Sequence, residues 1–137
     1  MKSIKKRFRM QLAEVMAAAG ELVCLAEGID LLLPAYELAG EVLLACRALE
    51  EKADGLHKSE FVALIAGDEA LLQLDEAVDY DLISCLEERF AKALGQTPAP
   101  QLDALLQQML EKLENKQAVM NQRIQQLGSL LNESEPD

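Results

Sequence analysis

The chain has 137 residues, with 13 basic and 24 acidic side chains, so its formal charge is −11. Half of its residues are apolar, and a chain of this length buries roughly 70% of the surface that it exposes when unfolded. We therefore expect a single domain, residues 1–137, whose core needs no disulfide or metal. One His, no Trp and no glycine-rich loop leave little for metal, nucleophile or phosphate chemistry.

Charge is segregated along the chain. Residues 1–9 hold five basic side chains, whereas residues 10–95 hold 18 acidic and five basic ones, a net of −13. Such a surface repels nucleic acid, so we expect no nucleic-acid partner. Glu14 and Glu21 interrupt the apolar run that follows the basic residues, which argues against a secretory signal and a membrane-spanning helix. We expect a cytoplasmic protein that makes no membrane contact.

The three cysteines, Cys24, Cys46 and Cys85, lie far apart among apolar neighbours. Their odd number and the absence of Cys-x-x-Cys spacing predict reduced thiols packed in the core.

Apolar residues recur at three- and four-residue steps over 4–29, which predicts an amphipathic helix of about eight turns. Pro34 marks the start of a second helix, because proline is tolerated in the first turn. This helix continues to about Ala53, where Asp54 and Gly55 end it.

The middle of the chain carries shorter helical segments. Ser59 predicts the N-cap of a short helix that ends at Gly67, and Asp68 predicts the next N-cap. Residues 69–94 then continue at helical spacing, with a possible break at 79–81. After this break, apolar residues form a four-residue ladder of Leu82, Leu86, Phe90 and Leu94.

No segment predicts a strand, because β-branched and aromatic residues are sparse. The predicted fold is therefore all-α: an elongated antiparallel bundle of four to five helices, with long N- and C-terminal helices. The predicted parts are an N-terminal helical part (1–67), middle helices (68–94), a Pro-containing linker (95–100), a long C-terminal helix (101–131) and an acidic tail (132–137).

The C-terminal helix carries a seam typical of a coiled coil. The seam residues, spaced by three or four with one stutter around Gln117, are Leu102, Leu106, Met109, Leu113, Gln117, Met120, Ile124, Leu127 and Leu131. Its 31 residues span roughly 46 Å, whereas a compact globule of this size is roughly 37 Å across. It must pair with a second long helix, either within the monomer or in a dimer. Antiparallel pairing with the first helix would set residues 2–9 beside Glu133, Glu135 and Asp137.

Acidic residues are dense within the predicted middle helices: Asp75, Glu76, Asp79, Asp81, Glu87 and Glu88. Carboxylate metal sites in helical bundles pair Glu with His, but His57 is the only histidine, so we interpret the cluster as a solvated acidic face. Neither Ser59 nor Ser84 lies in a recognised nucleophile motif. We therefore expect no catalytic residue, no metal and no cofactor, and a protein that is not an enzyme.

Three segments together give a resemblance: Asp79-Tyr-Asp-Leu-Ile-Ser-Cys-Leu-Glu-Glu-Arg-Phe-Ala-Lys-Ala-Leu94, then Leu110-Glu-Lys-Leu-Glu-Asn-Lys-Gln117 and Arg123-Ile-Gln-Gln-Leu-Gly-Ser-Leu-Leu131. Over residues 70–131 the chain resembles FliT-type flagellar export chaperones. The resemblance implies a cytoplasmic helical bundle that holds the amphipathic tail of an export substrate, such as a filament-cap subunit. Residues 1–67 depart from the family's pattern, which leaves the partner's identity open.

Independently of that resemblance, a long helix with an apolar stripe offers anchors for a partner helix at i, i+3 and i+4. The candidate partner-binding residues are Leu106, Met109, Leu113, Met120, Ile124 and Leu127. Three alternatives stay open. The stripe could be buried as core; it could form a homodimer, giving a scaffold or regulatory protein; or the acidic surface could mimic nucleic acid and bind a basic partner.

Overall fold

The computed structural model describes residues 3–95 and 100–133, and these residues form six α-helices, one 3-10 helix and no strand. The elements are α1 (Ile4–Ala26), η1 (Asp30–Leu32), α2 (Leu33–Asp54), α3 (Lys58–Ala66), α4 (Glu69–Asp79), α5 (Leu82–Leu94) and α6 (Pro100–Glu133). The predicted all-α class is confirmed. The predicted number of four to five helices is too low, because the chain turns between α4 and α5, where the prediction left a break open.

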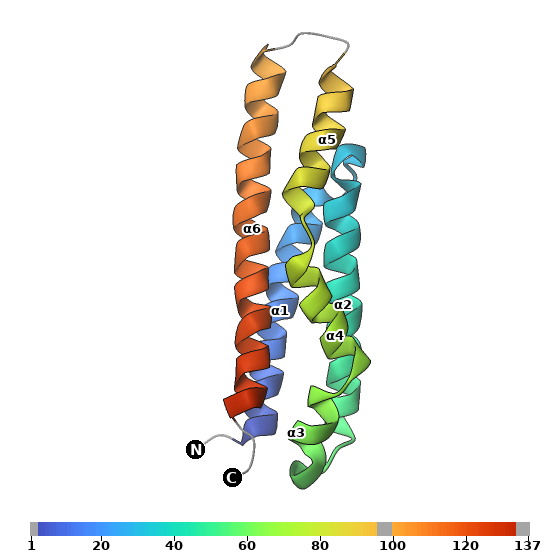
Figure 1. Ribbon diagram of the computed structural model, residues 1–137, viewed down its shortest axis with the longest axis vertical. Helices are drawn as coiled ribbons and strands as arrows, with labels where there is room; N and C mark the ends of the chain where they lie inside the picture. The colour runs from blue at the N-terminus through green and yellow to red at the C-terminus, as the bar shows by residue number, and fades with distance from the viewer. Residues whose placement is uncertain (1–2, 96–99, 134–137) are drawn as a thin grey trace.

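The molecule is an elongated bundle with four sides (Figure 1). Helices α1 and α6 run antiparallel along each other, α2 returns antiparallel to α1, and α3, α4 and α5 follow one another along the fourth side. The start of α1 and the end of α6 lie at the same end. At the other end, α5 and α6 extend beyond the corner between α1 and α2 (Figure 1). The predicted pairing of the first and last helices is confirmed.

Buried side chains from all six α-helices form one hydrophobic cluster. In α1 the predicted stripe supplies Phe8, Leu12, Val15, Ala19, Leu22 and Ala26, and Ala18, which was not predicted, is buried beside them. The stripe ends before the predicted Ile29, which is exposed. Gly28 explains this end, because its φ of 77° lies in the left-handed region, which terminates a helix. Only glycine adopts this conformation at little energetic cost.

Aspartate residues form the N-caps of α4 and α5. Asp68 accepts a hydrogen bond from the backbone N–H of Ala70 at 2.9 Å, as its predicted N-cap role requires. Asp81 accepts from the backbone N–H of Ser84 at 3.2 Å, which confirms the predicted break near residues 79–81. The predicted N-cap of α3 is wrong: the helix begins at Lys58 after His57, so Ser59 lies inside its first turn.

The ends of α6 differ slightly from the prediction. The helix begins at Pro100 and reaches Glu133, so the predicted tail at 132–137 begins inside the helix. The central linker residues 96–99 and the last residues 134–137 lie outside the described part of the chain.

The contact expected between the basic N-terminus and the acidic tail involves side chains that the structure does not describe. Within the described residues, the basic turn of α1 contacts the end of α2 instead. Arg9 pairs with Asp54 at 3.3 Å, and Lys5 Nζ donates to the carbonyl oxygen of Leu56 at 3.2 Å.

From Leu110 onward the seam of α6 follows a regular heptad, without the stutter predicted around Gln117. Its buried residues at alternating steps of three and four are Leu110, Leu113, Gln117, Met120, Ile124, Leu127 and Leu131. The prediction chose Met109 where the structure buries Leu110, and that choice placed the stutter near Gln117.

Gln117 is the polar residue in this seam, and it is 7% exposed. Its Nε2 donates to the carbonyl oxygen of Tyr80 at 3.0 Å, at the break between α4 and α5. One turn further, Asn121 Nδ2 donates to the carbonyl oxygen of Val78 at 3.5 Å. A helix end leaves carbonyl groups without intrahelical partners, so these two amides provide hydrogen bonds where the adjoining helix is interrupted.

Candidate protein-binding site

The structure divides the six predicted partner-binding residues into two groups. Leu113, Met120, Ile124 and Leu127 are buried in the bundle, where they belong to the hydrophobic core. The reason is that α1 packs along α6 and covers the seam. Leu106 and Met109 are only partly buried.

Two polar contacts show how α1 and α6 are aligned over the covered part of the seam. Arg123 Nη1 donates to the carbonyl oxygen of Glu14 at 2.8 Å, and Lys116 Nζ pairs with Glu21 at 3.5 Å. The partners are seven residues apart on each helix and run in opposite directions, as an antiparallel pair requires. Because α1 ends at Ala26, it cannot cover α6 much beyond this region.

An apolar groove, here called the open-end groove, lies where α1 stops. Its lining comes from the end of α1, from η1 and from the N-terminal half of α6, and its volume is about 270 Å³. The lining residues are Leu25, Leu32, Leu105, Gln108, Met109, Lys112 and Leu113. Figure 1 shows the cause: α6 continues past the α1–α2 corner.

Leu105 is the most exposed apolar side chain in the open-end groove, at 61%. The sequence prediction missed it, because it lies beside the seam position Leu106. A usable signal was the pair of adjacent leucines, because the predicted seam used Leu106 and gave Leu105 no core position.

Arg89 of α5 holds η1, which forms one wall of the open-end groove, by two hydrogen bonds. Its Nη2 donates to the carbonyl oxygen of Asp30 at 2.8 Å, and its Nε donates to that of Leu31 at 3.2 Å. A guanidinium binds two neighbouring carbonyls in a fixed geometry. Leu32, which follows them, is fully buried and lines the groove.

The cysteines occupy three different environments, so the prediction of three core thiols is correct only for Cys46. Cys24 is exposed, because it lies off the buried stripe of α1. Cys85 is half-buried. Burial, followed by the negative charge of Glu50, raises the pKa of the Cys46 thiol to about 12. This thiol is therefore protonated at neutral pH and a poor nucleophile.

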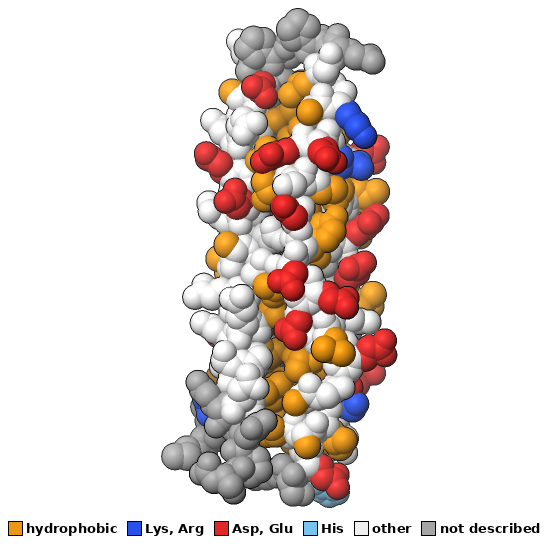
Figure 2. All heavy atoms as spheres, in the orientation of Figure 1, with side chains coloured by type: hydrophobic (Ala, Val, Ile, Leu, Met, Phe, Trp, Pro, Cys, Tyr) orange, Lys and Arg blue, Asp and Glu red, His pale blue; other side chains and the backbone are white. Residues whose placement is uncertain are grey.

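The predicted acidic face is exposed. Asp75, Glu76, Asp79, Asp81, Glu87 and Glu88 all lie on the surface of α4, α5 or the turn between them. Figure 2 shows acidic side chains spread over this face, with apolar side chains exposed between them. Among the described residues, no group of His, Cys, Asp and Glu side chains is arranged to hold a metal ion, and His57 is exposed at the start of α3.

Within residues 3–95 and 100–133, none of the helices has the length and apolarity needed to cross a bilayer. Comparisons with protein-family models, with curated proteins and with solved structures find no match.

Proposed function

We propose that this protein is a non-enzymatic helix-binding protein whose open-end groove holds an amphipathic segment of a protein partner. One observation carries the proposal: Leu105 is 61% exposed beside the half-buried Leu106 and Met109, above an apolar floor that includes Leu32. We further propose that the protein acts in the cytoplasm as a chaperone for a secreted or flagellar client. The resemblance to FliT-type chaperones supports that client class.

The groove has the chemistry that an amphipathic helix requires. Leu105 and Met109 are one turn apart on α6, so both side chains lie on the groove side of the helix. Burying apolar surface contributes about 25 cal/mol per Å², and Met adapts to partners of different shape. Lys112 lies at the same groove and offers a positive charge to an acidic residue of the partner.

Site-specific photocrosslinking tests this proposal. A photoreactive phenylalanine derivative replaces Leu105 in one variant and Val119 in a control variant; Val119 is also exposed on α6 but does not line the groove. We expect position 105 to crosslink to one amphipathic segment of another protein, and position 119 not to do so. A synthetic copy of that segment should then bind the wild type, and at least tenfold more weakly the Leu105→Asp variant.

Two results would contradict the proposal. The first is an identical set of crosslinked proteins from both positions. The second is a crosslink from position 105 to another copy of the chain, with a dimer mass in light scattering. That second result would instead support a homodimeric scaffold.

A further inference from the structure

A second groove lies on another face of the bundle, between α2 and α4, and has a volume of about 480 Å³. We name it the α2–α4 groove. Its lining residues from α2 are Leu38, Glu41 and Leu44, and those from α4 and its C-terminal end are Gln73, Glu76, Ala77 and Tyr80. This groove shares no lining residue with the open-end groove.

The α2–α4 groove offers apolar contacts that the bundle itself does not use. Leu44 is 66% exposed and Tyr80 is 43% exposed, while Leu38 and Ala77 are buried beneath them. Leucine and tyrosine at such exposure are typical of anchor positions for a partner, and tyrosine is enriched in protein interfaces. The volume is sufficient for several side chains of a partner.

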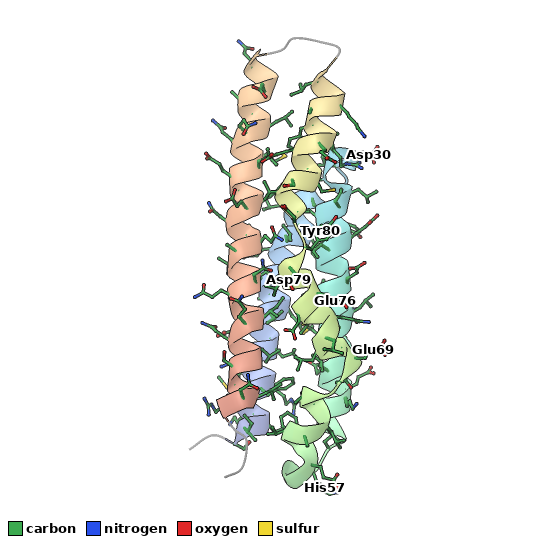
Figure 3. The ribbon with its side chains drawn as sticks, in the orientation of Figure 1. Asp30, His57, Glu69, Glu76, Asp79 and Tyr80 are labelled. Atoms are coloured by element: carbon green, nitrogen blue, oxygen red, sulfur yellow. The ribbon has the colours of Figure 1, made fainter. Side chains whose placement is uncertain are left out.

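The charges at this groove have one sign. Glu41 lies on the α2 side and Glu76 on the α4 side, and neither is paired with Lys or Arg among the described residues. Helix α4 contains four acidic residues and no basic one. Figure 3 shows Glu69, Glu76 and Tyr80 following one another along α4 and its C-terminal end.

Acidic side chains of α2 contribute to a shift in the pKa of Tyr80, the tyrosine of this groove. Hydrogen bonding with Cys85, partial burial, and then the charges of Cys85, Glu37 and Glu41 raise the pKa of the Tyr80 phenol above its ordinary value. Both of these carboxylates belong to α2, so acidic side chains of the α2 wall act on the tyrosine at the end of the α4 wall.

We infer that the α2–α4 groove docks a basic amphipathic helix of a protein partner, with leucine-type side chains against Leu44 and Tyr80 and lysine or arginine side chains beside Glu41 and Glu76. Charge complementarity selects this occupant: a positive ammonium or guanidinium group compensates the two unpaired carboxylates, and an acidic or neutral helix does not. The surface differs from the one in the proposed function and stands independently of it.

The probe is a synthetic 18-residue helix with leucine on one face and lysine on the other. Two reference peptides accompany it: one has glutamine in place of lysine, and one has the same composition in scrambled order. Binding to full-length protein is measured by fluorescence anisotropy at low and high salt. We expect the lysine helix to bind more tightly than both reference peptides, and to weaken as salt rises.

Matched variants locate the binding. Glu41→Gln/Glu76→Gln removes two charges from the groove, and Glu14→Gln/Glu60→Gln removes two exposed charges from other faces. We expect the first pair to weaken binding by about threefold to tenfold and the control pair by less than about twofold. Leu44→Gln should weaken binding at both salt concentrations, whereas Leu105→Gln should leave it unchanged.

Three results would overturn the inference: absence of binding by the lysine helix, equal losses in the two double variants, or equal binding by the scrambled peptide. Loss of binding in Leu105→Gln alone would place the peptide in the open-end groove and also reject the inference. That result would leave the proposed function standing. Conversely, failure of the crosslinking experiment leaves the α2–α4 groove unaffected.

Discussion

Replacing a leucine on each half of α6 gives a direct test of which half belongs to the core. Leu127 is fully buried in the seam, whereas Leu105 is 61% exposed at the open-end groove. Truncating a buried leucine to alanine costs about 2–5 kcal/mol, because apolar contacts are lost and a cavity remains. An exposed substitution costs less than about 0.5 kcal/mol. The same chemical change should therefore have very different effects at the two positions.

Urea denaturation followed by circular dichroism measures the difference. With a urea dependence of about 2 kcal/mol per M, Leu127→Ala should lower the midpoint by about 1–2.5 M, and Leu105→Ala by less than about 0.3 M. Measurement at two protein concentrations controls for association. Equal shifts in the two variants, or a loss below about 1 kcal/mol for Leu127→Ala, would contradict the packing of α1 over this seam.

Three further predictions concern single side chains. Arg89→Met should destabilise the fold by about 1–2 kcal/mol and speed hydrogen exchange over residues 29–33, because two hydrogen bonds to carbonyls of η1 are lost; unchanged exchange there would refute this role. Hydrogen bonding to Lys52 lowers the pKa of the Asp68 carboxyl, so its stabilisation is present above its ordinary pKa and is lost as pH falls through the lowered value. Asp68→Asn, which can still cap α4, should be less stable than wild type by up to about 1 kcal/mol at pH 7 in urea denaturation, and a gap that persists at pH 2 would contradict this sign. A maleimide should modify the exposed Cys24 in the native protein and the buried Cys46 only after unfolding; early labelling of Cys46 would reject its place in the core.

Residue spacing predicted most of the helices and their boundaries. Three- and four-residue steps identified the stripe of α1, and the N-cap at Asp68 and the break at 79–81 marked helix starts that the structure confirms. These features depend on neighbours within four residues, so they can be read locally. The choice between Met109 and Leu110 depends instead on which residue faces a distant helix.

The candidate site could be predicted only in part, because burial along α6 depends on where α1 ends. Seam residues from Leu113 to Leu131 share one sequence pattern with Leu106, yet α1 covers the former and leaves the latter half-exposed. The turn at Gly28 and the corner held by Arg89 fix that limit. The α2–α4 groove is a further tertiary feature, since its two walls are distant in sequence.

Hydrogen exchange along α6, in the free protein and with the captured partner segment, tests the central claim most directly. In the free protein we expect strong protection over residues 120–131, where α1 covers the seam, and faster exchange over residues 103–109. Addition of the segment should slow exchange over 103–109 and leave 120–131 unchanged. Slow exchange along the whole helix in the free protein, or new protection confined to 120–131, would contradict the division of α6 into a core half and a partner-binding half.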